Sequence, residues 1–253
     1  MTYRLTIFLI AFCLPKLGFA QQPGLAQAAM DYFNSATLTD AQVAEYSRQA
    51  VQQMDAKNPV AAPNDPYTQR LNRIVSRHRT VSGLPINYKV YKVPEVNAFA
   101  TADGSVRVFK GLMDIMTDNE LLAIMGHEIG HVINHDSRDA MKSALRRSAV
   151  RNVAASQSGL IGKVSRSQLG GLADYMMGAS FSRRQESEAD DYSYDFMKRN
   201  GYNVMALATS FEKLAKQGGG GGGSVTQILS THPDSKARAQ RVRDRARRDG
   251  LAR

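Results

Sequence analysis

The sequence predicts an α+β fold that is mainly helical, with one small antiparallel sheet in the first half of the chain. Three short segments alternate apolar and polar residues as half-buried strands do, at 86–93, 98–101 and 106–109. The turn Ala102-Asp103-Gly104 would join the last two strands as a hairpin. Helical patterns cover most of the rest, and 253 residues with 43% hydrophobic side chains are enough for one substantial core.

Two helices should precede the sheet. Thr39 stands three residues before a glutamine, the pattern of a capping box, and opens a helix that ends near residue 58. Asp65-Pro66 has the N-cap residue and the first-position proline of a second helix. We expect this second helix to reach Arg79 and to close at Ser82-Gly83.

The most informative segment is His127-Glu128-Ile129-Gly130-His131, inside a helical pattern that a capping box at Thr117 opens. Histidines four residues apart lie one turn above each other, so both imidazoles can reach one zinc ion. Glu128 projects from the same turn and could take a proton from a water held there. The apolar flanks predict a buried helix, where histidine and glutamate need partners. They disfavour the alternative, a solvated helix that carries these residues by chance.

Gly126 and Gly130 each precede one of the two histidines. Glycine lowers the stability of a helix, so its use at both positions needs a reason. We expect another backbone to approach this face of the helix closely.

A third ligand should come from downstream, because a catalytic zinc keeps three protein ligands and one open position. We expect one long helix from Leu169 to Arg199, on which Glu186 and Asp190 lie one turn apart. Glu186 would bind the metal, and Asp190 would accept a hydrogen bond from a ligand histidine. A solvated acidic helix face is the alternative.

Three segments in this order resemble one peptidase family. They are the block from Asn97 to Asp136, which contains Asn-Ala-Phe-Ala-Thr and the His-Glu-x-x-His motif, the segment Ser182 to Asp190, and Ser230-Thr231-His232-Pro233 with Arg238 beyond it. The chain is similar, from about Pro66 to Arg243, to the zinc metallopeptidase family of the CAAX prenyl endopeptidases, HtpX, BepA and LoiP. Its nearest resemblance is to the soluble periplasmic members of the LoiP type.

The resemblance implies a zincin-type (gluzincin) metallopeptidase with a small antiparallel sheet beside the motif helix. One Zn2+ per chain would be bound by His127, His131 and Glu186, with Glu128 as catalytic base and Asp190 in support. The substrates would be proteins or peptides. A structural zinc in a binding or chaperone module is one rival, which an intact Glu128 disfavours. A basic surface-binding protein with a degenerate protease fold is the other.

The resemblance also places two further features by the active site. His232 would lie near the metal, where it could bind the oxyanion of the reaction or block the fourth position of the zinc; a histidine held only by packing is the alternative. The strand Asn97-Ala98-Phe99-Ala100 would border the cleft and pair with an extended substrate, unless it is an ordinary sheet edge.

The first 20 residues have the pattern of a secretory signal peptide, with Arg4, an apolar stretch and Gly18-Phe19-Ala20 as cleavage site. We expect cleavage after Ala20, an N-terminal helical extension and linker at 21–64, and a zinc metallopeptidase domain at 65–253. The protein would then be periplasmic. Cys13 is the only cysteine, but Phe12 before it disfavours an outer-membrane lipoprotein.

The remaining segments are less decisive. Residues 139–178 could form a helix, a mobile loop or a lid, 203–216 predict a helix, and the glycine run 218–223 should be flexible. We expect His135 at the surface or behind the ligands, and His78 at the surface. The net charge is +10, and many of the basic residues lie near the end. We interpret them as a solvated helix, with peripheral contact to a membrane or to outer-membrane proteins as the alternative; export excludes nucleic acid.

Overall fold

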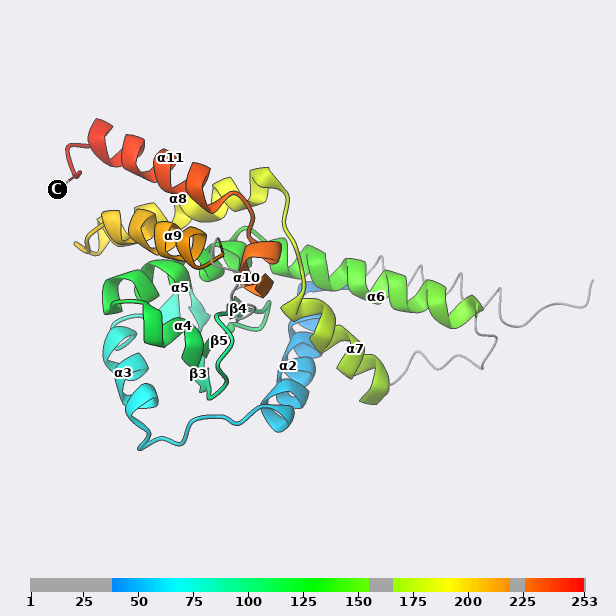
Figure 1. Cartoon of the computed structure of the whole chain (residues 1–253). Coiled ribbons are helices and arrows are strands. Elements are labelled where there is room, and N and C mark those ends of the chain that lie inside the picture. Colours follow the sequence, from blue (N-terminus) through cyan, green and yellow to red (C-terminus); the bar gives the residue numbers. More distant parts are fainter. Residues whose placement is uncertain (1–37, 155–165, 219–225, 253) are drawn as a thin grey trace, which may run out of the picture.

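The computed structural model describes residues 38–154, 166–218 and 226–252. The expected signal peptide and most of the glycine run lie outside these ranges. Helix α5 (Asp118–Ile133) occupies the middle of the molecule (Figure 1). A small sheet lies on one side of α5. On the other side lie α8 (Arg183–Arg199) and α9 (Met205–Gly218), with α11 (Ser235–Arg248) packed over them.

The main sheet has three strands in the order β3-β5-β4. Strands β4 (Ala98–Ala100) and β5 (Ser105–Phe109) form the predicted antiparallel hairpin. Strand β3 (Asn87–Tyr91) instead runs parallel to β5, so the sheet is mixed rather than wholly antiparallel. Alternation along a strand shows which residues are buried but not which neighbour the strand pairs with, so this direction was not in the sequence pattern.

The N-terminal helices begin where predicted, but the second is shorter. Thr39 and Gln42 cap α2 (Asp40–Lys57) reciprocally, and α3 (Pro66–Ile74) starts after Asp65. The prediction that α3 reaches Arg79 was wrong. Ser82-Gly83 instead forms the two-residue turn between β1 (Thr80–Val81) and β2 (Leu84–Pro85), with φ of 50° and 80°. Two successive positive φ angles are typical of the tight hairpin turns that follow the twist of the strands.

The predicted single helix from Leu169 to Arg199 is two helices. Helix α7 (Arg166–Met177) ends before Gly178, and α8 begins after Ser182, whose side chain forms a capping box with Gln185. Residues 139–154 belong to α6 (Asp136–Ala154) and residues 166–177 to α7. The described part of 139–178 is therefore almost wholly helical. Short helices α4 (Lys110–Ile115) and α10 (Thr226–Thr231) complete the chain.

Helices α2, α6 and α7 form a second apolar cluster against the sheet, to the side of α5 (Figure 1). Asp55 of α2 also accepts hydrogen bonds from Arg107 Nε at 2.7 Å, Lys89 Nζ at 2.8 Å and Tyr91 Oη at 2.8 Å. Arg107 is 2% exposed, so this ion pair is shielded from water. Helix α2 is therefore joined to the sheet by an ion pair as well as by apolar packing.

Two histidines outside the motif differ in their environment. His78 was expected at the surface, but it is 5% exposed, with Nε2 3.0 Å from the hydroxyl of Tyr202 and its ring against Phe196. His135 is exposed, which agrees with the predicted surface position and not with a position behind the ligands. It has a φ of 67° in the turn between α5 and α6.

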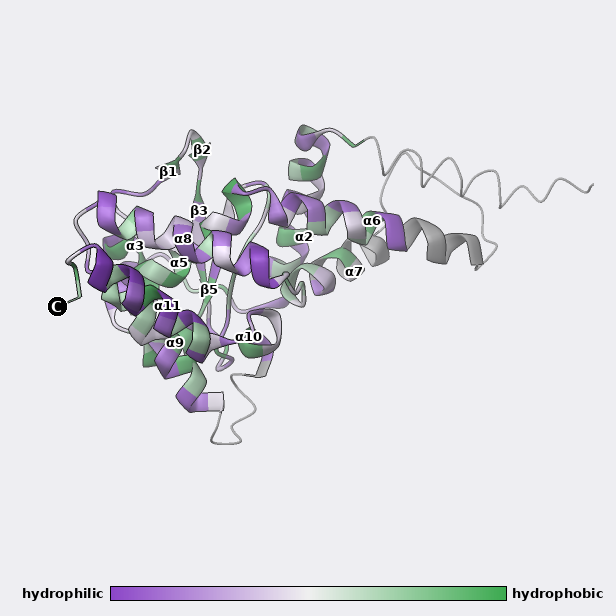
Figure 2. Ribbon diagram, turned by 90° about the horizontal axis from the view of Figure 1, so that it is seen from above, coloured by the Kyte–Doolittle hydropathy of each residue, from purple (hydrophilic) through white to green (hydrophobic). Residues whose placement is uncertain are grey.

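Helix α11 is strongly hydrophilic (Figure 2). Its arginines are largely paired within the chain: Arg243 with Glu212, Arg245 with Asp195 and Arg247 with Asp244. These pairs neutralise much of the positive charge and favour the solvated terminal helix over a membrane contact. Among the described residues, the helices are all too short or too polar to cross a membrane.

Candidate metal centre

Helix α5 is buried along nearly its whole length. Its first turn is fixed by the capping box of Thr117 and Glu120, and Glu120 also accepts a hydrogen bond from Lys213 at 2.6 Å. The motif lies two to three turns further on, where His127, Glu128 and His131 are 2%, 4% and 1% exposed. The predicted buried helix is confirmed.

Helix α8 crosses α5 at the two glycines. A Cβ atom on Gly130 would lie 3.1 Å from Ala189 Cα, and one on Gly126 would lie 3.1 Å from Ser193 Oγ. Ser193 donates a hydrogen bond of 2.7 Å to the carbonyl of Ala123, across the same contact. The expected close approach of a second backbone is confirmed, and it brings Glu186 and Asp190 to the motif histidines.

Replacing Gly130 with alanine should test the importance of this approach. We expect Gly130→Ala to lower the free energy of unfolding by about 1–3 kcal/mol, because the added methyl must push α8 away. Gly171→Ala is the matched control, since a Cβ at Gly171 meets nothing within 4 Å and alanine favours a helix. Denaturant unfolding of both variants measures the effect. Equal stability of the two variants would contradict the prediction.

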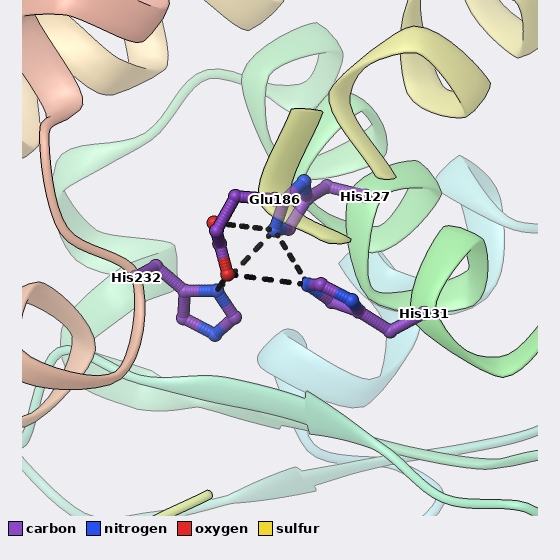
Figure 3. Close-up of side chains that lie close together, drawn as sticks. All are labelled: His127, His131, Glu186 and His232. Atoms are coloured by element: carbon purple, nitrogen blue, oxygen red, sulfur yellow. Dashed lines mark hydrogen bonds and ion pairs between the residues drawn. The ribbon is translucent and has the colours of Figure 1, made fainter. Parts of the chain in front are cut away.

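Four side chains from three elements point to one place (Figure 3): His127, His131, Glu186 and His232. His127 Nε2 lies 3.2 Å from His131 Nε2 and 3.6 Å from Glu186 Oε2. His131 Nε2 lies 3.5 Å from Glu186 Oε1. His232 Nδ1 lies 3.3 Å from His127 Nε2 and 2.9 Å from Glu186 Oε1.

These distances suit a tetrahedral metal. Zinc bonds of about 2.0–2.1 Å place two ligand atoms about 3.3–3.4 Å apart. The two Nε2 atoms are 3.2 Å apart, and each faces a different oxygen of the Glu186 carboxylate, at 3.6 Å for His127 and 3.5 Å for His131. Glu186 Oε2 is buried and accepts no hydrogen bond within the described residues, although a guanidinium nitrogen lies 2.6 Å away. Each carboxylate oxygen has two lone pairs, so this contact leaves room for a metal at the same oxygen.

Carboxylates behind both motif histidines turn their Nε2 atoms toward the site. His127 Nδ1 lies 3.0 Å from Asp190 Oδ1, and His131 Nδ1 lies 2.9 Å from Asp136 Oδ2. Burial lowers the pKa of His127 well below its usual value, which favours the neutral ring that binds metals. Burial also opposes a charge on His131, but hydrogen bonds with Asp136 and Glu186 raise its pKa to about 9. Metal binding would displace this proton.

A pocket opens beside the centre, next to Glu128. It is bordered by strand β4, the end of α7 and the segment around His232, with Met176, Met177, Ala179 and Phe181 on its apolar side. The Phe181 ring stacks on His131 at 3.9 Å. Glu128 Oε1 lies 3.6 Å from His232 Nε2. The structure therefore places His232 beside the motif histidines, and Asn97, Ala98, Phe99 and Ala100 along the pocket.

The comparison with known proteins agrees with this geometry. The sequence profile of peptidase family M48 matches residues 65–246. The chain belongs to peptidase family M48. Metalloprotease LoiP of Escherichia coli K12 is 47% identical over 229 residues, 90% of each chain. Metalloprotease YcaL of that strain is 41% identical over 219 residues, 86% of this chain and 85% of its own. The beta-barrel assembly-enhancing protease of that strain is 31% identical over 223 residues, 83% of this chain and 45% of its own.

Membership of family M48 confirms the family, fold class and enzyme class that the sequence predicted. The M48 peptidase is a metalloendopeptidase that acts on proteins or peptides with a divalent metal. The buried cluster of two histidines, a glutamate and a third histidine is its candidate metal centre.

Sequence reasoning assigned no role to Asp136 or Arg238 in this M48 peptidase. Asp136 follows His131 by five residues, and it returns to the His131 ring because His135 turns the chain with a positive φ. The sequence signal that could have predicted this contact is the pair His131 and Asp136 on either side of the helix end. Arg238 was noted only as part of a motif, yet it lies 2.6 Å from both Glu186 and Asp190.

Proposed function

We propose that this protein is a zinc-dependent endopeptidase of the bacterial cell envelope that degrades misfolded or misassembled proteins. One observation carries the proposal. The ligand atoms of His127, His131 and Glu186 lie close enough together to hold one ion, and Glu128 lies beside them at the edge of a pocket. A purely structural metal site would have no use for the buried Glu128.

The residues of the chain have distinct roles in this proposal. His127, His131 and Glu186 hold the zinc, and Asp190 and Asp136 orient the two histidines. Bound zinc polarises the scissile carbonyl and makes water a better nucleophile.

Glu128 then acts on the attacking water and on the leaving group. Its carboxylate takes the proton of the water and passes it to the leaving amine. Burial raises the pKa of Glu128, which makes its carboxylate a stronger base for the proton of the water.

Strand β4 supplies the binding edge for the peptide. It is an edge strand in the order β3-β5-β4, because β5 pairs with one of its sides and no strand of the described residues pairs with the other. Ser137 Oγ donates a hydrogen bond of 3.2 Å to the carbonyl of Ala100. The residues Asn97, Ala98, Phe99 and Ala100 border the pocket, so an extended substrate that paired there would place its side chains beside Glu128.

The envelope location and the substrate class rest on the sequence and on one relative. Residues 1–20 have the pattern of a signal peptide, with a mature domain organisation of 21–64 and 65–253. The beta-barrel assembly-enhancing protease shares 31% identity over 223 residues, which supports protein substrates in the envelope and contact with outer-membrane proteins. The intact mass of the exported protein tests the predicted cleavage of the signal peptide. We expect an N-terminus at Gln21, and a lipid on Cys13 would contradict it.

The enzymatic proposal is tested with purified protein and casein. We expect hydrolysis that a chelator stops and that stoichiometric Zn2+ restores. Hydrolysis that survives complete metal removal would exclude the metal mechanism. A protein that binds zinc and does not cleave casein or unfolded envelope proteins would favour the binding module.

Removing His232 separates its two suggested roles. Its Nδ1 occupies the fourth corner of the ligand cluster, so we expect His232→Ala to raise basal hydrolysis of a small peptide several-fold by opening that position. Initial rates with saturating zinc measure the change. Lower turnover would instead assign His232 to the oxyanion. Unchanged turnover and zinc affinity would mean that packing alone holds it.

A further inference from the structure

A buried arginine from the C-terminal helix reaches the metal centre. Arg238 of α11 is 6% exposed, and its guanidinium lies over the ring of Phe211 at 4.1 Å. An arginine is always charged and is seldom buried without partners, so its contacts must offset the loss of hydration.

The guanidinium bridges the two carboxylates of α8. Its Nη1 lies 2.6 Å from Glu186 Oε2. Its Nη2 and Nε contact both oxygens of Asp190, at 2.6 and 3.0 Å. Glu186 and Asp190 are one helical turn apart on α8, so their like charges repel each other unless a cation lies between them. The planar guanidinium satisfies both at once, which a lysine ammonium does less well.

The contact extends to a motif histidine. Asp190 Oδ1, which Arg238 holds, lies 3.0 Å from His127 Nδ1. Arg238 Nη2 also lies 3.2 Å from His127 Nδ1 and 3.3 Å from His127 Nε2. Arg238 therefore contacts both proposed ligands, Glu186 and His127, directly, and it reaches His127 a second time through Asp190. A second arginine of α11, Arg241, contacts Asp190 at 2.8 Å but makes no such contact with Glu186 within the described residues.

We infer that Arg238 is a positioning residue for the metal centre. It fixes the rotation of the Glu186 carboxylate and the position of Asp190, so that two ligands are in place before a metal arrives. It also neutralises the paired carboxylates, which keeps the cluster assembled without a metal. This inference rests on the proposed metal role of Glu186. An arginine that only fastens α11 to α8 is the rival.

The test compares three variants of the full chain. Arg238→Met removes the bridge and Arg238→Lys keeps the charge. Arg243→Met is the control, because Arg243 lies on the same helix and pairs with Glu212 at the surface. Zinc affinity is measured by competition with a chromophoric chelator, and the ligand field by the absorption spectrum of the Co2+-substituted protein.

We expect Arg238→Met to weaken zinc binding by about 10–100-fold, as the loss of an outer-sphere partner does. The Co2+ bands should shift, Arg238→Lys should lie between Arg238→Met and the unmodified protein, and Arg243→Met should match the unmodified protein. Unchanged affinity and spectrum in Arg238→Met would overturn the inference, even with a lower Tm, and would leave only the fastening role.

Two further measurements keep the result decisive. If Arg238→Met does not fold, Arg238→Lys carries the test: unchanged zinc affinity and Co2+ spectrum would reject the bridge. Glu186→Gln separates this inference from the proposed function. If Glu186→Gln binds zinc as tightly as the unmodified protein, the ligand assignment fails. If it loses zinc while Arg238→Met does not, only the role of Arg238 fails.

Discussion

Glu128→Gln should reduce peptide hydrolysis by about 10²–10⁴-fold, the contribution of a well-placed general base. The amide has nearly the shape of the carboxylate but cannot accept the proton of the water. Glu128 does not belong to the ligand cluster, so zinc content should stay at one ion per chain. Initial rates on an internally quenched peptide, with metal analysis of the same sample, measure both quantities.

A control and the pH profile sharpen this test. Glu188→Gln, on the exposed face of α8, should leave the rate unchanged because it removes a similar charge outside the centre. Burial raises the pKa of Glu128, so the ionised base is lost at a higher pH than for an exposed glutamate. The acidic limb of kcat/KM should therefore disappear from the residual activity of Glu128→Gln. Retention of the full rate would refute the role of Glu128.

The part of the site on α5 was predictable because its chemistry is local. The spacing of His127 and His131 fixes their shared helix face, and the flanking apolar residues show that this face is buried. The capping box at Thr117 gave the start of the helix. The glycines predicted that another backbone approaches α5 closely. They did not show that this backbone would be α8.

Other parts of the site depend on tertiary contacts that one sequence does not encode locally. Arg238 reaches Glu186 from a helix 52 positions downstream in the numbering, and no periodic pattern links the two. The parallel direction of β3 against β5 could not be predicted for the same reason, because the whole topology decides which strands pair. The break between α7 and α8 was different. The capping pattern at Ser182 was present, but the long helical period around it obscured it.

The loss of a direct ligand should have the largest effect on the metal. The loss of a residue that only contacts a ligand weakens metal binding by about 10–100-fold. We expect Glu186→Gln to weaken zinc binding by more than this, because a neutral amide replaces a charged oxygen ligand. Hydrogen bonds with His131 and His232 hold the pKa of Glu186 well below its usual value despite burial, so the native group is ionised and ready for a cation.

Thermal unfolding gives a second readout for Glu186. A metal that binds only the folded state raises the Tm, so added Zn2+ should stabilise the unmodified protein and Glu188→Gln but not Glu186→Gln. The activity of Glu186→Gln should be negligible at zinc concentrations that saturate the unmodified protein. An equal rise in Tm for Glu186→Gln and Glu188→Gln would show that the zinc ligand is another residue. Asp190 would then be the first residue to test, because it lies one turn further along α8, 3.0 Å from His127 Nδ1.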